Sequence, residues 1–239
     1  MGDKGLTIVG VTSEGSGMTE KWIEKNGAEF AYAYDKGSKL SRFFGVGGIP
    51  HAILVDANGT VIWRGHPGSL KDATVSKALE GTIPTPLWEF PSEAKDVAKA
   101  LSSRKFAKAL EAANKMGESG QGYADIVNAL ANGRVALMSS AQEEGDWLTI
   151  DDKGKDIAGM LKGMEQAGEV EVILAALKGD KEAQGILKAQ KKVKKILSAK
   201  IKKKEIPAIK DKLKKISKDF PGTAVERDVI KGIERLTDR

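Results

Sequence analysis

One run, Phe44–Pro67, restricts the folds open to this chain more than any other segment. It reads FGVGGIPHAILVDANGTVIWRGHP and has apolar, β-branched segments at His51–Val55 and Thr60–Trp63. Between them, Asp56–Gly59 has the composition of a tight turn, in which Gly59 is free to adopt a positive φ. This pattern predicts a β-hairpin that directly follows an Ile-Pro pair.

Short strands and helices are predicted to alternate on either side of this hairpin. The segment Leu6–Val11 is apolar and β-branched, which is typical of a strand buried on both faces. Gly27 is well placed to end a helix over Met18–Asn26 in a left-handed conformation. Further elements are expected at Glu29–Tyr34 (a short edge strand), Ser38–Phe44 (one or two helical turns) and Leu70–Leu79 (a helix). The pattern indicates an α/β domain over residues 1–82.

A proline-rich segment follows this domain. Thr82–Pro91 contains Pro84, Pro86 and Pro91. Because proline removes a backbone donor and disfavours helix at the preceding residue, we expect a linker over residues 83–91. Residues 92–239 carry apolar residues at helical spacing, with helix-start signals at Ser92, Gly179–Asp180, Pro207 and the capping-box pattern Thr223–Glu226. This region is predicted to be an all-α domain, a helical-hairpin array or small bundle.

Charge is distributed unevenly between the two regions. Residues 1–90 hold nine Lys/Arg and ten Asp/Glu, a net charge of −1, whereas the remaining residues hold thirty and twenty-three, a net charge of +7. Such asymmetry indicates two modules with different surfaces. No apolar run approaches the ~18 residues of a membrane span, and the start MGDKG lacks the basic and apolar regions of a signal peptide. The sequence leaves the cellular compartment open.

The chain contains no cysteine, which excludes disulfides, thiolate metal sites and cysteine nucleophiles. The hairpin is expected to bring His51 and His66 near one another, with His51 opposite about Arg64. Two histidines without further ligands fall short of a metal site, and a structural role is expected for both. The glycines at positions 45, 47 and 48 precede a strand, which does not fit a phosphate-binding loop. No cofactor is expected.

The most basic segment is Lys188–Lys218, which contains fourteen lysines. Since a basic helix can bind nucleic acid or anionic lipid, Lys202, Lys203 and Lys204 are candidate anion-binding residues. The segment has no arginine and no aromatic residue suited to base stacking. Its apolar residues keep helical spacing, so we interpret the lysines as the solvated face of packed helices. Nucleic acid and membranes are therefore not the expected partners.

The region around the Ile-Pro pair resembles the thioredoxin-like superfamily. Matching segments occur in the order Tyr34-Asp35-Lys36-Gly37, Leu40, Phe44-Gly45-Val46, Gly48-Ile49-Pro50, the Asp-x-x-Gly turn and Trp63-x-Gly65-His66-Pro67. This order is similar to thiol–disulfide oxidoreductases of the TlpA/ResA type over about residues 5–80. The resemblance implies a cis-proline at Pro50 and a peptide-binding loop of Gly48, Ile49 and Pro50. It also implies thiol–disulfide exchange in an exported or periplasmic compartment.

The chain departs from this family at its beginning. The family places a strand and a Cys-x-x-C helix before the counterpart of Leu6–Val11, and only five residues precede that segment here. In the family the absent strand lies centrally, between the counterparts of Leu6–Val11 and His51–Val55, so its loss leaves backbone groups without partners. The flanking strands could pair directly, a second chain could complete the sheet in a homodimer, or the sequence could be a fragment. We expect direct closure or dimerisation.

The leading hypothesis is an incomplete thioredoxin-like domain without redox activity, followed by the all-α domain. Thiol–disulfide exchange requires a thiolate, so the chain is expected to serve as a protein-interaction module with a protein or peptide partner rather than as an enzyme. One alternative is a truncated piece of an exported TlpA/ResA-like oxidoreductase. A second alternative is a basic helical domain that binds nucleic acid or an anionic membrane.

Overall fold

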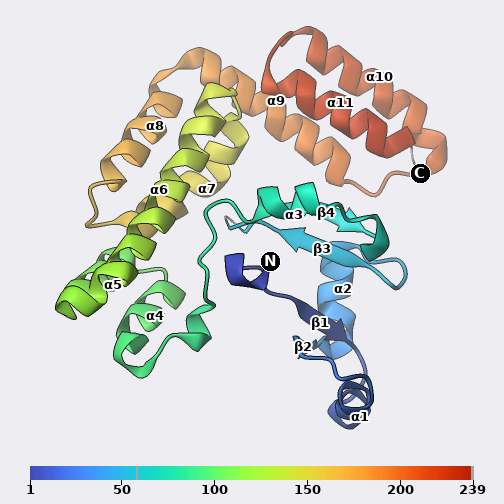
Figure 1. The fold of residues 1–239 in the computed structure, drawn as a ribbon. Helices are drawn as coiled ribbons and strands as arrows, with labels where there is room; N and C mark the ends of the chain where they lie inside the picture. Colours follow the sequence, from blue (N-terminus) through green and yellow to red (C-terminus); the bar gives the residue numbers. More distant parts are fainter. Residues whose placement is uncertain (58, 238–239) are drawn as a thin grey trace. The chain divides into compact units, whose positions relative to one another are not determined.

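The computed structural model describes residues 1–57 and 59–237, and it divides the chain into two compact units (Figure 1). The first unit spans Met1–Lys95 and the second Asp96–Arg239. Among the described residues, strands occur only in the first unit, and the second is helical. The described part of the chain contains no helix long and apolar enough to cross a membrane.

The first unit contains strands and helices in the order expected from the sequence. Its strands are β1 (Val9–Thr12), β2 (Ala31–Tyr34), β3 (Ala52–Val55) and β4 (Val61–Gly65). Its α-helices are α1 (Ser16–Asn26), α2 (Lys39–Phe44) and α3 (Asp72–Ala78), and its short 3-10 turns are η1 (Gly2–Lys4), η2 (Lys36–Ser38), η3 (Pro67–Ser69), η4 (Leu87–Glu89) and η5 (Ser92–Ala94). Helix α1 ends at Gly27, which adopts the left-handed conformation with φ 60°.

The strands form two separate two-stranded sheets. β1 pairs with β2 in parallel, and β3 pairs with β4 in antiparallel orientation. Of the two expected outcomes, direct pairing of the flanking strands is wrong, since no ladder joins β1 to β3 among the described residues, and completion of the sheet by a second chain stays a prediction. The two sheets are instead linked ahead of β1. Leu6 packs against the cluster of Leu54, Val75 and Ala78, and Thr82 Oγ1 donates a hydrogen bond to Lys4 O (2.9 Å).

The hairpin has the expected strands in a different register. Arg64 pairs with Ile53 rather than with His51. The difference is two residues, because Val55 pairs with Val61 rather than with Thr60, and a bulge at Ile62 of β4 then shifts all later pairs by one residue more. The predicted turn includes Asn58, which lies outside the described residues.

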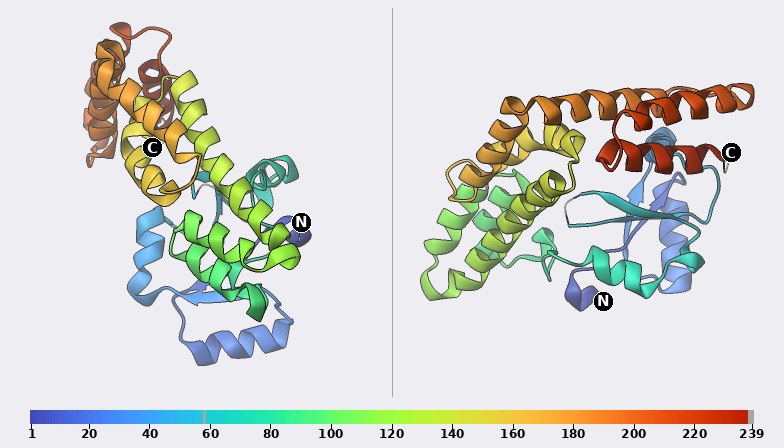
Figure 2. Two further views of the ribbon diagram at one scale, coloured as in Figure 1. Left: turned by 90° about the vertical axis from the view of Figure 1, so that its left-hand side faces the viewer. Right: turned by 90° about the horizontal axis from the view of Figure 1, so that it is seen from above.

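The second unit consists of helices that pack on their neighbours along the chain. Contacts join α5 to α6, α6 to α7, α7 to α8, and α9 to α10 and α11, and Figure 2 shows the last three side by side. The helices are α4 (Lys95–Ser102), α5 (Phe106–Asn114), α6 (Gln121–Glu143), α7 (Trp147–Leu161), α8 (Ala167–Gly179), α9 (Lys181–Ser198), α10 (Ile206–Lys218) and α11 (Ala224–Thr237), with the 3-10 turns η6 (Gly117–Gly120) and η7 (Lys203–Glu205). Their inner faces form an extensive apolar core that includes Met138, Ile150, Leu161 and Leu213.

Some helix starts have the geometry expected from the sequence and others do not. Asp180 caps α9 by accepting hydrogen bonds from two amides of the first turn (2.8 and 3.2 Å), and Pro207 lies in the first turn of α10. Ser92 does not cap a helix, because its hydroxyl bonds to the adjacent carboxylate. The predicted capping box is also wrong: Thr223 Oγ1 donates to a carbonyl, and Glu226 accepts from the amide that precedes Thr223.

Candidate functional site

The first sheet has one open edge. The carbonyl oxygen of Thr12 accepts a hydrogen bond from Asp35 N (2.8 Å), so the backbone of Thr12 faces β2. In a parallel ladder, successive residues of a strand direct their N–H and C=O groups to opposite edges. Val9 and Val11 therefore direct their backbone groups away from β2, along the open edge of β1.

The second sheet has a corresponding open edge on β3. β3 pairs with β4 on one side, and no strand among the described residues bonds to its other side. In Figure 1, β1 and β3 run in opposite directions. Leu6, just before β1, packs against the cluster that contains Leu54 of β3. A strand placed between the two sheets could bond to both edges, parallel to one strand and antiparallel to the other.

Apolar side chains on these strands are unusually exposed. The exposed fraction is 56% for Ile8, 47% for Val9, 47% for Val11 and 46% for Val55. By contrast, the buried cluster against which Leu6 packs contains only the three residues Leu54, Val75 and Ala78. These exposed side chains are candidates for contact with a partner.

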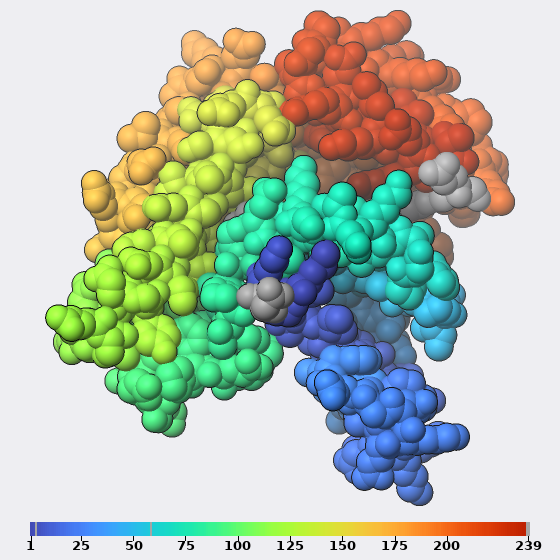
Figure 3. All heavy atoms as spheres, in the orientation of Figure 1, coloured from blue at the N-terminus to red at the C-terminus, as the bar shows by residue number. Residues whose placement is uncertain are grey.

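Helix α1 adds further exposed apolar surface to the first unit. None of its residues is buried, and Figure 3 shows its side chains uncovered on the face in view. Met18 and Trp22 are among its exposed residues, and Trp22 packs edge-to-face on Tyr32 with the ring centroids 6.1 Å apart. Because most helical stability in proteins comes from tertiary packing, α1 is held weakly by this chain.

The loop predicted to bind peptide leads directly into β3. The peptide bond between Ile49 and Pro50 is cis. Ile49 is 91% exposed, and a Cβ added at Gly47 or Gly48 would meet open space. The loop of Gly48, Ile49 and Pro50 therefore presents its backbone and one apolar side chain to solvent at the beginning of the open strand.

Asp35 fixes the start of α2, the helix that precedes this loop. Its side chain is buried and accepts hydrogen bonds from Leu40 N (2.8 Å), Ser41 N (3.0 Å) and Ser41 Oγ (2.8 Å). The backbone donors of Leu40 and Ser41 lower the pKa of Asp35 from its ordinary value. This role was not predicted, although Asp35 lies in the segment Tyr34-Asp35-Lys36-Gly37 that contributed to the family resemblance.

The two histidines flank the pair formed by Ala52 and Gly65, but the described residues contain no group of three metal ligands. His66 Nδ1 accepts a hydrogen bond from Gly68 N (3.1 Å), in keeping with a structural role. His51 Nε2 is buried and has no partner among the described residues. His51 is therefore not satisfied in the way that the sequence led us to expect.

The three candidate anion-binding lysines lie apart from this site, in the turn between α9 and α10. Lys202, Lys203 and Lys204 are all exposed, and Lys202 N donates to Glu205 Oε2 (2.9 Å). Elsewhere in the basic segment, Val193, Leu213 and Ile216 are buried, and most of the lysines are exposed. Two lysines of α9 pair with carboxylates of α7: Lys191 with Asp151 and Lys194 with Asp152, each at 2.6 Å.

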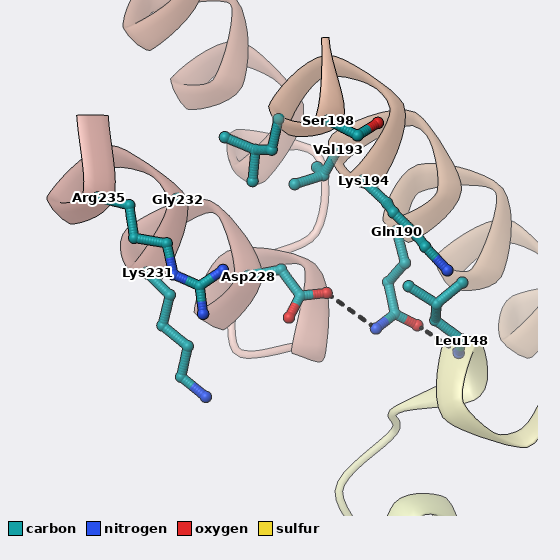
Figure 4. A pocket seen from close by; sticks show the side chains of 10 residues that line it. Leu148, Gln190, Val193, Lys194, Ser198, Asp228, Lys231, Gly232 and Arg235 are labelled. Atoms are coloured by element: carbon teal, nitrogen blue, oxygen red, sulfur yellow. Dashed lines mark hydrogen bonds between the residues drawn. The ribbon is translucent and has the colours of Figure 1, made fainter. Parts of the chain in front are cut away.

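A polar network unexpected from the sequence lies beside a cavity of about 370 Å³ in the helical unit (Figure 4). Gln190 of α9 is 1% exposed. Its oxygen accepts from Leu148 N (3.0 Å), and its nitrogen donates to Asp146 Oδ1 (3.0 Å) and Asp228 Oδ2 (3.0 Å). Burial raises the pKa of Asp228, and the nearby charge of Asp146 adds to this effect against the opposing hydrogen bond from Gln190.

The hydrogen bonds of this network hold the helices α7, α9 and α11 together. Asp146 also caps α7 by accepting from Thr149 N (3.2 Å) and Thr149 Oγ1 (2.6 Å). Gln190 thus joins α9 to the start of α7 and to Asp228 of α11. The one signal in the sequence was a glutamine at the helical spacing of buried Ile186 and Val193.

Comparison with known proteins identifies a relationship for the N-terminal part of the chain. The AhpC/TSA family matches residues 1–64. The match indicates that this region belongs to the thioredoxin-like superfamily, in agreement with the general resemblance seen in the sequence. No curated protein and no solved structure matches the chain.

Proposed function

We propose that the Met1–Lys95 unit is a thioredoxin-like protein-interaction module without thiol–disulfide activity of its own. The AhpC/TSA match supports kinship with thioredoxin-like peroxiredoxins and thiol oxidoreductases. The chain contains no cysteine, and thiol–disulfide exchange begins with the attack of a thiolate. The exposed loop before β3 and the unpaired strand edge are features suited to binding a polypeptide.

The exposed loop at the beginning of an open strand edge carries this proposal. Ile49 is 91% exposed, and the glycines before it leave the loop backbone accessible. An extended peptide can add to such an edge through main-chain hydrogen bonds, with specificity from neighbouring side-chain contacts. Gly48, Ile49 and Pro50 are accordingly proposed as the peptide-binding loop.

Two assays on the full chain test this function. In an insulin-reduction assay, the chain should not accelerate reduction above the rate of the small-molecule reductant alone. Reduced and alkylated insulin B chain, a polypeptide that cannot form disulfides, serves as the binding probe. Ile49→Asp should weaken its binding by about fivefold or more, because an apolar contact is lost. The control Val172→Asp, at a residue of α8 that is also exposed, should leave binding unchanged.

Accelerated insulin reduction would show thiol–disulfide activity in a chain without cysteine and would contradict the proposed function. Equal binding by the wild type and the Ile49→Asp variant would remove the loop from the site.

Anion binding by Lys202, Lys203 and Lys204 is a second candidate function. It is favoured by their exposure and by the absence of carboxylate ion pairs to them among the described residues. Salt-titrated retention on DNA and on anionic vesicles tests it, with all three lysines replaced by glutamine as the control. Retention that disappears in this variant supports the site, and no retention at low salt refutes it.

A further inference from the structure

We propose that the cavity between α9 and α11 binds a small amphipathic carboxylate, with the apolar chain of the ligand against α9 and its charged group beside Lys231 and Arg235 of α11. All residues that line this cavity belong to the helical unit. The inference goes beyond the interaction function proposed for the Met1–Lys95 unit, and neither proposal depends on the other.

The cavity is lined by one face of each of two helices that pack together. Residues three and four positions apart lie on the same face of an α-helix. The lining has this spacing on both helices, with Gln190, Val193, Lys194 and Leu197 on α9 and Asp228, Lys231, Gly232 and Arg235 on α11. A Cβ added at Gly232 would lie 2.5 Å from the Leu197 side chain, so the two helices are in close contact there. The cavity volume of about 370 Å³ lies within the range of ligand pockets.

Aliphatic side chains form the apolar part of the wall. Val193 is 1% exposed, and Leu148 and Leu197 are half-buried. The lining contains no aromatic residue on which a planar ring could stack. A hydrocarbon chain placed against these three residues would be removed from water, which stabilises the bound state in proportion to the apolar area covered. The wall therefore favours an aliphatic ligand over an aromatic one.

Two cationic side chains of the lining are available to a ligand. Lys231 and Arg235 are exposed, and neither forms an ion pair among the described residues. The ammonium group of Lys194 differs, because it is bound to Asp152 of α7 (2.6 Å). A guanidinium group can bind a carboxylate through two parallel hydrogen bonds. Lys231 and Arg235 therefore favour an anionic ligand group.

Asp228 limits the charge of that anion. Its carboxyl group is half-buried and accepts a hydrogen bond from Gln190 Nε2 (3.0 Å) (Figure 4). Because Lys194 is already paired, the remaining charged groups of the lining carry one positive charge in excess. This excess suits a monoanion such as a carboxylate better than a phosphate dianion. Burial also raises the pKa of Asp228, and a protonated carboxyl group can donate to a ligand oxygen instead of repelling it.

The charged groups around Asp228 come from three elements. They are Asp146 at the start of α7, Lys194 of α9, and Arg227, Lys231 and Arg235 of α11. The lysines and arginines stay protonated near neutral pH. We therefore expect the carboxylate ligand to bind more tightly as the pH falls through the pKa of Asp228. Asp228→Asn separates this contribution from those of Asp146 and of the ligand itself.

Isothermal titration calorimetry of the full chain with octanoate tests the site. We expect one octanoate to bind per chain. Lys231→Gln combined with Arg235→Gln should weaken binding by about tenfold or more, because two charge-assisted contacts are lost. The control combines Lys178→Gln with Lys181→Gln, two exposed positions outside the lining. It removes the same charge and should change the affinity by less than about twofold.

Asp228→Asn and a cationic probe give a second, independent test. The variant should bind octanoate about threefold more tightly at neutral pH, because a negative charge beside the ligand is removed. Its affinity should also depend less on pH than that of the wild type from about pH 6 to 8. Octylamine has the same chain with a cationic head group, and it should bind the wild type at least about tenfold more weakly than octanoate does.

Four results would overturn the proposal. No heat of binding and no change in amide NMR spectra with octanoate up to about 10 mM would show that the cavity does not take this ligand. An equal loss of affinity in the Lys178 and Lys181 control would indicate general attraction to a basic surface. Tighter binding of octylamine than of octanoate would make Asp228 the recognition group. Weaker octanoate binding by the Asp228→Asn variant would contradict the repulsion on which the pH dependence rests.

Discussion

Replacement of Gln190 by leucine should strongly destabilise the helical unit. The two side chains are similar in size, so Gln190→Leu removes polar contacts without opening a large cavity. Leu148 N would lose its acceptor, and the carboxylates of Asp146 and Asp228 would each lose a donor. An unsatisfied buried group costs about 1–3 kcal/mol, and a hydrogen bond to a charged group contributes about 1.5–3 kcal/mol.

These contributions are not additive, and Asp228 keeps partial access to water, so the net loss should be at least ~3 kcal/mol. With a urea m-value of about 3 kcal/mol/M, the midpoint of unfolding should fall by about 1 M. The assay is urea denaturation of the full chain followed by far-UV circular dichroism. It reports chiefly on the helical unit, because that unit contains most of the helical residues.

Gln121→Leu is the matched control. Gln121 Nε2 donates to Asp125 Oδ1 (2.9 Å) on the exposed surface of α6. The same substitution at this surface position should change the free energy of unfolding by less than about 0.5 kcal/mol. Equal midpoints for the two variants would show that the buried network does not stabilise the unit and would refute the reasoning.

Four further substitutions, one of them a matched control, test other parts of the structure. Asp228→Asn should raise the stability of the helical unit at neutral pH. Because the pKa of Asp228 is raised, the wild type is stabilised as the pH falls through that pKa and loses this contribution as the pH rises. Parallel pH–stability curves for the two proteins would contradict the raised pKa of Asp228. Asp35→Asn should loosen α2. Because the pKa of Asp35 is lowered in the folded state, its carboxylate stabilises the wild type above its unfolded pKa, and this contribution should disappear as the pH falls through the folded pKa. The variant should lack this contribution at every pH, as followed by tryptophan fluorescence. A Cβ at Gly120 would overlap the carbonyl oxygen of Ala113, whereas one at Gly122 would meet open space. Gly120→Ala should therefore destabilise the helical unit by about 2 kcal/mol in urea titrations, as overpacking of a tight contact does. Gly122→Ala should instead stabilise it by up to about 1 kcal/mol, and the opposite order of the two variants would contradict the packing around η6.

Local patterns in the sequence predicted most of the individual elements. The hairpin around residues 52–65 and the order of strands and helices in the first unit follow from β-branched runs and glycine turns. Gly27, Asp180 and Pro207 act at helix ends as their chemistry requires. These signals depend only on residues that are close in the sequence, so they can be recognised without knowledge of the tertiary fold.

Features that depend on distant contacts were predicted less well. Direct pairing of β1 with β3 was one of the two expected outcomes and is absent among the described residues, because the partner of a strand edge depends on residues far away in the sequence. The register shift depends on a bulge that places Ile62 as an extra residue. Gln190 looked like an ordinary helical residue, and only the positions of Asp146, Leu148 and Asp228 reveal its three hydrogen bonds.

The candidate site was predictable in part. The exposed loop of Gly48, Ile49 and Pro50 was located from its sequence order, since the Ile-Pro pair precedes a clear strand. The support that Asp35 provides for α2 was missed, because a carboxylate that accepts from amides five and six residues away has no fixed sequence pattern.

β1 and β3 each have one edge without a strand partner among the described residues. Residue-resolved amide exchange of the full chain without any added partner tests this arrangement most directly. The amides of Val9 and Val11 face the open edge and should exchange at least about tenfold faster than those of Gly10 and Thr12, which face β2. Slow exchange at Val9 and Val11, equal to that of their neighbours, would mean that a strand already pairs with this edge and would contradict the account.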